Sequence, residues 1–207
     1  MRVLYLHGFA SGPGSTKARF FATRFGERGI SVVVPALVDE FERMTLRSQL
    51  EVVARVHAGE PSVIMGSSMG GYLAALYAAR HAGITHVICL APAFDFAARW
   101  AARLGEAEVA RWHDSGWLTV HHYGENRPAR VGWQLMEDAR RFEPYPRVTQ
   151  PALIYHGRRD DVVPVEVSRE FAARNPNAML RVVESGHELT DVTETLWEGV
   201  CGFLGLS

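Results

Sequence analysis

The sequence predicts an α/β protein with a mostly parallel, doubly wound sheet and helices on both of its faces. The first observation behind this prediction is that short apolar runs alternate with longer helix-like segments along most of the chain. Such alternation is typical of βα units, which build parallel sheets. The second observation is a Gly-x-Ser-x-Gly motif at residues 66–70, between an apolar run and a helix-like segment.

The apolar runs predict strands, and the longer segments between them predict helices. The helix expected at 69–81 is rich in alanine, which lets it pack close beneath the preceding turn. In order along the chain, strands are predicted at 2–6, 31–34, 62–66, 85–91, 151–155 and 178–183. The helices are predicted at about 15–28, 45–58, 69–81, 165–174 and 190–204.

The composition fits one domain with a full hydrophobic core. The chain has 207 residues, of which 47% are hydrophobic, and a chain of this size buries most of its apolar surface. The formal net charge is −1, so no nucleic-acid partner is expected. Lys17 is the only lysine among the 22 basic residues. We interpret this excess of arginine as coding bias rather than as a binding signal.

Cysteine content and hydropathy favour a cytoplasmic protein. The two cysteines, Cys89 and Cys201, do not make a disulfide framework, and both are expected to be buried thiols. Met1 leads directly into a strand, so no signal peptide is expected. No apolar run approaches the length of a membrane span. The sequence therefore predicts a cytoplasmic protein with no membrane contact.

The motif Gly66-Ser67-Ser68-Met69-Gly70 is the strongest functional signal in the chain. Between a strand and a helix, Gly-x-Ser-x-Gly forms the nucleophile elbow of α/β-hydrolases. The turn is so tight that the central serine is strained, and the two glycines leave room for neighbouring backbones. We therefore predict an α/β-hydrolase fold with Ser68 as its nucleophile. A flexible loop before a helix is the alternative interpretation of the motif alone.

A serine nucleophile needs a histidine that accepts its proton and a carboxylate that orients the histidine. In α/β-hydrolases these partners follow the serine in the order acid, then histidine. Asp160 follows the strand at 151–155, and His187 follows the strand at 178–183. Because functional groups gather at the carboxyl ends of parallel strands, we predict Asp160 as the acid and His187 as the base.

Two other aspartates are alternatives to Asp160. Asp161 is the main alternative acid, or else it caps the helix that begins near Val165. Asp95, which follows the strand at 85–91, is a further alternative. The pair Arg158-Arg159 is expected to form a salt bridge between loops, with contact to an anionic substrate as the alternative.

The site also needs two backbone N–H groups that stabilise the negative charge of the tetrahedral intermediate, the oxyanion hole. One donor is expected from the residue after the nucleophile, Met69, and the other from the loop after an early strand. The loop that begins His7-Gly8-Phe9 follows the strand at 2–6, so we assign the second donor to the Phe9 amide. An ordinary turn at His7-Gly8 is the alternative.

The opening segment, Tyr5–Ala18, resembles that of the small bacterial esterases of the YqiA type. The segment 66–72 is similar to their nucleophile region, and the loops of the predicted acid and histidine fit their positions. The resemblance covers about residues 1–92 and 150–207. It implies a serine esterase that acts on short acyl esters and uses the three predicted residues as its triad.

The residues after the fourth strand interrupt the alternation. An insertion at this point of an α/β-hydrolase commonly forms a lid that controls access to the site. We predict one α/β-hydrolase domain with a core at 1–92 and 148–207 and a lid at about 93–147. Helices at 96–111 and 132–142 are expected within this lid.

The insertion contains most of the aromatic residues that the core does not account for. Its tryptophans either line an acyl pocket or pack the lid onto the core, and the two interpretations have equal support. The pair His121-His122 has no acidic or cysteine partner at ligand spacing. We therefore expect no metal, and no cofactor is expected either.

The predicted activity is the hydrolysis of short acyl esters through an acyl-enzyme intermediate. Hydrolysis of a thioester or peptide would use the same triad and is the alternative within catalysis. A hydrolase-fold protein that only binds a ligand or partner is the alternative outside catalysis. The expected partner is a small-molecule ester, and the oligomeric state is left open.

Overall fold

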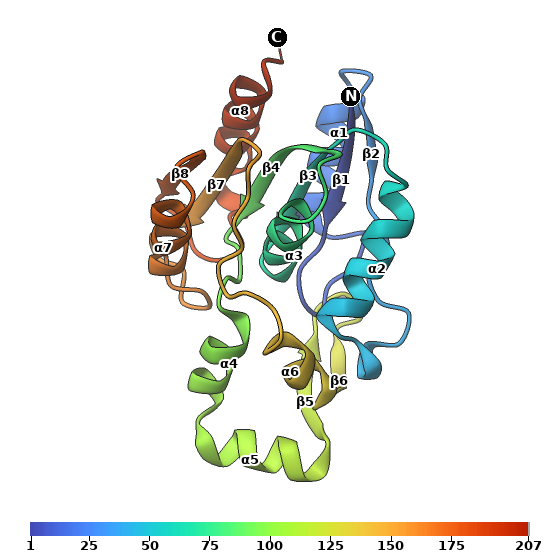
Figure 1. The fold of residues 1–207 in the computed structure, drawn as a ribbon, viewed down its shortest axis with the longest axis vertical. Coiled ribbons are helices and arrows are strands. Elements are labelled where there is room, and N and C mark those ends of the chain that lie inside the picture. Colours follow the sequence, from blue (N-terminus) through green and yellow to red (C-terminus); the bar gives the residue numbers. More distant parts are fainter. Residues whose placement is uncertain (207) are drawn as a thin grey trace.

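The core of the protein is a six-stranded sheet in which every neighbouring pair of strands is parallel (Figure 1). The computed structural model describes residues 1–206. The strand order is β2-β1-β3-β4-β7-β8, so all carboxyl ends meet at one edge. The six predicted strands are confirmed, with ends that differ by at most two residues. They are β1 (Arg2–Leu6), β2 (Ser31–Val33), β3 (Ser62–Ser67), β4 (Ile84–Leu90), β7 (Ala152–Gly157) and β8 (Ala178–Val183).

Helices cover both faces of this sheet, as the sequence predicts. The core on one face joins strand side chains to α1 and α8, and the core on the other joins them to α2, α3 and α7. The helices are α1 (Thr16–Gly26), α2 (Leu46–His57), α3 (Met69–Ala78), α7 (Glu166–Arg174) and α8 (Thr193–Leu204), with short 3₁₀ turns at Phe41–Arg43 and Thr190–Val192.

The two faces of the sheet are built from alternate residues of the same strands. In β1, Val3 and Tyr5 contact the core of α1 and α8, whereas Leu4 and Leu6 contact the opposite core. Successive side chains of a strand point to opposite faces, so a strand covered on both sides must be apolar throughout. This requirement explains the continuous apolar runs that predict the strands.

Helix boundaries follow local backbone chemistry more than hydrophobicity. Helix α2 begins after Thr45, whose hydroxyl accepts the Ser48 N–H at 3.0 Å while the Ser48 hydroxyl accepts the Thr45 N–H at 3.1 Å. This reciprocal pair satisfies two amide groups that the first helical turn leaves free. Helix α2 ends at His57, and the next residue, Ala58, adopts a left-handed conformation with φ +50°.

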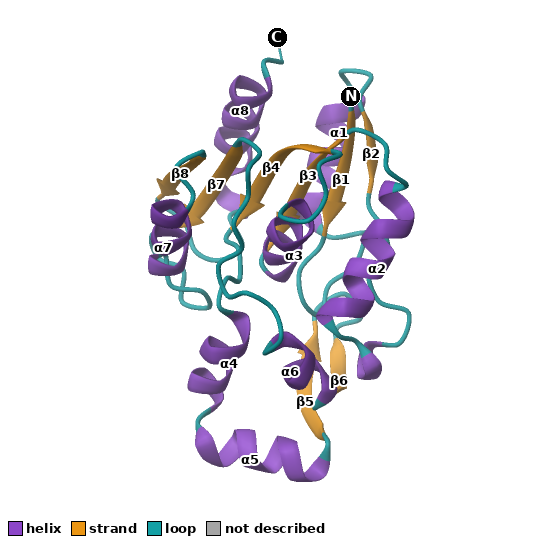
Figure 2. Cartoon of the chain, viewed as in Figure 1, coloured by secondary structure: helices purple, strands orange, loops and turns teal. Residues whose placement is uncertain are grey.

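The segment between β4 and β7 is not purely helical, which corrects the expectation of two lid helices. It forms α4 (Phe96–Leu104) and α5 (Glu106–Ser115), then a hairpin of β5 (Trp117–His122) and β6 (Arg127–Gly132), and finally α6 (Gln134–Ala139). These elements lie beyond the carboxyl ends of the strands (Figure 2). The helix expected at 96–111 is therefore two helices, and the hairpin was not predicted.

Two glycines explain where the helical expectation fails. Gly105, with φ +77°, separates α4 from α5, and Gly116, with φ +78°, ends α5. Both are left-handed positions that favour glycine. The hairpin buries few side chains, among them Leu118 and Val131, so its alternation of apolar and polar residues is weak in the sequence.

Within residues 1–206, no helix is long and apolar enough to cross a membrane. Both cysteines are free thiols. Cys89 is fully buried and donates to the Gly71 carbonyl at 3.4 Å, and burial raises its pKa to about 12. Cys201 is only partly buried, so the prediction of two buried thiols is correct for Cys89 and too strong for Cys201.

Candidate active site

Ser68 lies in the sharp turn between β3 and α3, with φ +54° and ψ −119°. A non-glycine residue with these angles is strained and persists only where the surrounding structure holds it. The Ser68 N–H donates to the Leu90 carbonyl at 2.9 Å, and the Ser68 carbonyl accepts the Ala93 N–H at 3.0 Å. The end of β4 therefore holds the backbone on both sides of the serine side chain.

The glycines on either side of Ser68 are required by close backbone contacts. A Cβ atom at Gly66 would clash with the Gly70 backbone, and a Cβ atom at Gly70 would clash with the carbonyl oxygens of Leu6 and His7. The first contact closes the turn, and the second lets α3 begin against the end of β1. Both glycines leave room for neighbouring backbones, as the motif predicts.

The structure brings Ser68, His187 and Asp160 together from three separate loops. His187 Nε2 lies 3.0 Å from Ser68 Oγ, and His187 Nδ1 lies 2.7 Å from Asp160 Oδ2. An ionised carboxylate can only accept, so Nδ1 carries the hydrogen and Nε2 is free to accept the serine proton. The Asp160 side chain is fully buried, and 12% of the His187 side chain is exposed.

The other two aspartates do not make this contact. Asp161 is exposed, and it does not cap the following helix, because α7 begins after Val165 with no side-chain cap. The alternative of a cap at Asp161 is therefore wrong. Asp95 adopts a left-handed conformation at the start of α4 and lies beside Arg99.

The carboxylate of Asp160 is surrounded by hydrogen-bond donors. Its Oδ1 accepts the amides of Val162 at 2.9 Å and Val163 at 2.7 Å, and its Oδ2 lies 3.1 Å from Nε2 of a second histidine, His156. Burial by itself would raise the pKa of Asp160. The hydrogen bonds from His156, His187 and Val163 outweigh burial and hold this pKa well below its ordinary value.

The amides assigned to the oxyanion hole are free. Among residues 1–206, neither the Phe9 N–H nor the Met69 N–H donates to another backbone group. Gly8 lies directly beside Ser68, since a Cβ atom placed on it would be 3.4 Å from Ser68 Cβ. Two unused donors thus flank the serine turn, one from the β1 loop and one from the start of α3.

His7 fixes the peptide that carries the Phe9 amide. Leu37 N–H donates to His7 Nε2 at 3.4 Å, so Nδ1 carries the hydrogen and donates to the Gly8 carbonyl at 3.0 Å. The carbonyl and N–H of one trans peptide point in opposite directions. Holding the Gly8 carbonyl against His7 therefore turns the Phe9 N–H away from His7.

Basic residues make hydrogen bonds and ion pairs with the loops that carry Asp160 and His187. Lys17 is buried, and its ammonium group donates to the carbonyl of Glu188, the residue after His187. Arg158 forms an ion pair with Glu184 at 2.5 Å, and Arg159 donates to the Glu184 carbonyl at 3.1 Å. The arginine pair thus bridges the two loops, as expected. The role of Lys17 was missed, although its being the only lysine was a signal.

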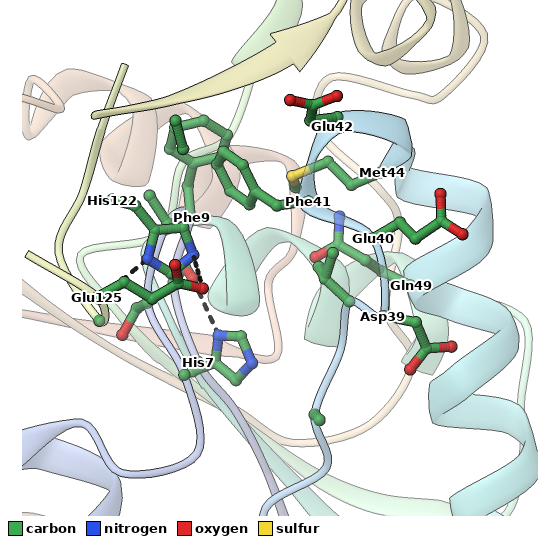
Figure 3. Close-up of a pocket in the computed structure, with 18 of the residues that line it drawn as sticks. His7, Phe9, Asp39, Glu40, Phe41, Glu42, Met44, Gln49, His122 and Glu125 are labelled. Atoms are coloured by element: carbon green, nitrogen blue, oxygen red, sulfur yellow. Dashed lines mark hydrogen bonds and ion pairs between the residues drawn. The ribbon is translucent and has the colours of Figure 1, made fainter. Parts of the chain in front are cut away.

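A cavity of about 580 Å³ lies beside the loop that carries the Phe9 amide (Figure 3). Its walls come from residues 7–13, the segment 36–44 and the β5–β6 hairpin. The rings of Phe9 and Phe41 lie 5.4 Å apart on it. Neither Ser68 nor His187 lines this cavity, and no tryptophan does.

Three of the four tryptophans of the insertion pack against one another, and the fourth, Trp117, is exposed beside Arg130. Trp112 is fully buried, with the rings of Trp100 and Trp133 at 5.0 Å and 5.3 Å. Trp100 also contacts Phe9 edge-to-face at 5.2 Å. This arrangement favours the packing interpretation over an acyl pocket lined by tryptophan. In the described part of the chain, no cluster of His, Cys, Asp or Glu side chains is arranged to hold a metal.

Comparison with known families decides which family the chain belongs to. Residues 2–203 match the uncharacterised protein family UPF0227. The chain belongs to this family. The family is of the YqiA type, so the resemblance seen in the sequence is confirmed. No curated protein matches the chain.

Solved structures confirm the α/β-hydrolase fold. Mouse alpha/beta hydrolase domain-containing protein 10 is 19% identical, with a TM-score of 0.83 over 99% of this chain and 89% of that one. Est1E from Butyrivibrio proteoclasticus with ferulic acid bound is 22% identical, with a TM-score of 0.82 over 98% and 87%. A structure from work on LipS and LipT, two metagenome-derived lipolytic enzymes, is 21% identical, with a TM-score of 0.71 over 99% and 93%.

The close contact at Gly70 predicts a large effect of one added methyl group. We expect Gly70→Ala to lower the free energy of unfolding by about 3 kcal/mol, because the Cβ atom must displace the end of β1. Gly202→Ala is the matched control, since a Cβ atom there meets nothing within 4 Å in α8. It should raise stability by roughly 0.5–1 kcal/mol. Urea unfolding measures both, and equal effects would contradict this account.

The lowered pKa of Asp160 predicts a pH-dependent contribution to stability. A group whose folded pKa is depressed stabilises the fold fully above its unfolded pKa, which is about 4, and loses this contribution as the pH falls further. Asp160→Asn should therefore lower the free energy of unfolding by about 2 kcal/mol at neutral pH. Urea unfolding of both proteins at several pH values should show this difference shrinking below about pH 4. A pH-independent difference would contradict the prediction.

Proposed function

We propose that this protein is a serine hydrolase, specifically a carboxylesterase that cleaves short acyl esters. The observation that carries the proposal is the hydrogen-bonded series Ser68–His187–Asp160, with distances of 3.0 and 2.7 Å, at a strained strand-to-helix turn. A hydroxyl, an imidazole and a buried carboxylate in this order are the parts of a nucleophilic triad. The α/β-hydrolase fold supports this assignment.

The geometry suits acyl transfer to water in two stages. Ser68 Oγ attacks the ester carbonyl carbon while His187 Nε2 accepts the serine proton. When the carbon–oxygen bond of the ester breaks, the leaving alcohol takes this proton from Nε2. Water then attacks the acyl-enzyme, gives a proton to the same nitrogen, and releases the acid as Ser68 regains its hydrogen. Asp160 stabilises the imidazolium that forms in each stage.

The amides of Phe9 and Met69 are proposed as the oxyanion hole. Each attack places a negative charge on the carbonyl oxygen of the substrate, and a preorganised donor loses no energy to reorganisation when the charge develops. These two amides have no backbone partner of their own. The hydrogen bond from His7 to the Gly8 carbonyl supports the required orientation of the Phe9 peptide.

The segment 93–147 is proposed as a lid on a core of residues 1–92 and 148–207. Helix α4 contacts both sides of the site: Trp100 packs on Phe9 of the oxyanion loop, and Arg99 donates to the Val162 carbonyl of the acid loop at 3.0 Å. An element joined to both loops can control how an ester reaches the serine. A small-molecule ester is the proposed substrate.

Removing the serine hydroxyl should abolish activity without disturbing the fold. We expect Ser68→Ala to lower the rate of p-nitrophenyl acetate hydrolysis by more than ~10³-fold, with an unchanged circular dichroism spectrum. Ser67→Ala is the matched control, because it removes the neighbouring hydroxyl of the same motif, and it should keep most of the activity. Undiminished turnover in Ser68→Ala would exclude this serine as the nucleophile.

The nature of the acyl bond is tested by a substrate series. We expect hydrolysis of p-nitrophenyl esters to fall from acetate to decanoate and to exceed that of acyl-CoA thioesters and peptide amides. Faster hydrolysis of the thioesters would instead identify a thioesterase. A fluorophosphonate probe should label Ser68 in the wild type, and a failure to label it would favour a hydrolase-fold binding protein.

A further inference from the structure

A second histidine contacts the carboxylate of the proposed triad from its buried side. His156 lies near the end of β7, four positions before Asp160, and its side chain has no exposure to solvent. Its Nε2 lies 3.1 Å from Asp160 Oδ2, the same oxygen that accepts His187 Nδ1 at 2.7 Å. The mechanism above gives this buried, titratable group no role.

The contacts of His156 determine where its hydrogen lies. Nε2 faces two acceptors, the Val163 carbonyl at 2.8 Å and the Asp160 carboxylate, so it must carry a hydrogen. Nδ1 lies 2.7 Å from the hydroxyl of Ser168 in α7, which can donate to it. A neutral imidazole with its hydrogen on Nε2 therefore donates mainly to the Val163 carbonyl and shares the same N–H with Asp160 Oδ2, the longer of the two contacts.

The contact from His156 adds to the donors around Asp160. Oδ1 accepts the amides of Val162 and Val163, whereas Oδ2 accepts His187 Nδ1 and lies 3.1 Å from His156 Nε2. A carboxylate has about four lone-pair positions, so any rotation of this side chain would break a bond. The negative charge of Oδ2 is also divided between two N–H groups instead of being directed at His187 alone.

We propose that His156 is a positioning residue of this site: its Nε2–H holds the Asp160 carboxylate toward His187 and takes a share of its charge. The inference rests on the proposed function only in its catalytic consequence, because the hydrogen bond itself needs no substrate. Sharing the charge leaves less of it directed at His187, so removal of the His156 donor should strengthen the interaction of Asp160 with the His187 imidazolium.

The other charged groups that face Asp160 are fixed in place. Lys17 of α1 is held by the carbonyl and carboxylate of Glu188, and Arg99 of α4 is held by the carbonyls of Phe94 and Val162. Lysine and arginine side chains remain charged near neutral pH, whereas histidine titrates there.

Two substitutions separate the hydrogen bond from the volume of the side chain. His156→Leu removes the donor, and His156→Gln keeps an N–H group close to the position of Nε2. His57→Leu is the matched control, because His57 is also a buried histidine but lies near the opposite edge of the sheet, where its carbonyl accepts from Arg2 at the start of β1. It should lower stability without affecting the site.

The first measurement needs no substrate. It is the titration of the His187 ring, monitored by proton NMR, with the ring signal of His187 identified by its loss in His187→Ala. We expect His156→Leu to move its midpoint to higher pH by about half a unit or more, His156→Gln to restore most of the wild-type value, and His57→Leu to leave it unchanged. An unchanged midpoint in His156→Leu would overturn the proposal.

The catalytic readout is the pH profile of kcat/KM for p-nitrophenyl acetate. In His156→Leu the acidic limb should shift in the same direction, with kcat reduced roughly 10- to 100-fold, as expected for loss of an outer partner. A lower kcat with an unmoved limb would indicate a purely structural role and would also overturn the proposal. If the NMR midpoint shifts but the wild type hydrolyses no ester, the proposed function fails and the role of His156 stands.

Discussion

The buried carboxylate of Asp160 is the interaction on which the site depends. An ionised carboxylate without contact to water is unfavourable unless hydrogen-bond donors replace the lost hydration. Here the donors come from β7, from the acid loop itself and from the loop after β8. The first two segments adjoin Asp160 in sequence, but His187 lies 27 residues further along the chain, so the full set of donors is present only when β7 and β8 have paired. The charge that orients His187 is thus also a reason for the two loops to stay together.

The strained serine is supported in a similar way by β1 and β4, the strands on either side of β3. A residue in such a conformation typically costs on the order of 1–3 kcal/mol. The Ser68 N–H donates to the Leu90 carbonyl and the Ser68 carbonyl accepts the Ala93 N–H, which connects the turn to the end of β4, and Gly70 packs against the end of β1. Because both neighbours are central, fully covered strands, the core itself holds the serine in place.

The insertion after β4 contacts the loop that carries Phe9 and the loop that carries Val162. Trp100 contacts the ring of Phe9, and Arg99 contacts the acid loop through the Val162 carbonyl. A displacement of α4 would therefore displace both the loop that carries Phe9 and the loop that carries Val162. Lys17 adds a further connection, since it ties the first turn of α1 to the residue after His187. The loops around Ser68 are thus connected to one another by hydrogen bonds and packing.

Local pattern and residue type by themselves determined the strands, the main helices, the elbow at Ser68 and the partners Asp160 and His187. They did so because a doubly covered strand must be apolar and because the elbow tolerates only glycine at its close contacts. Only the tertiary structure decided the hairpin at 117–132, the position of Lys17 and the contact of His156 with Asp160. The hairpin buries too few side chains to give a clear alternation of apolar and polar residues in its sequence. A histidine at the end of an apolar strand does not by itself indicate which residue it contacts. The contacts of its ring are formed within residues 156–168, where β7, the following loop and α7 fold around the imidazole, and residue type alone does not show this geometry.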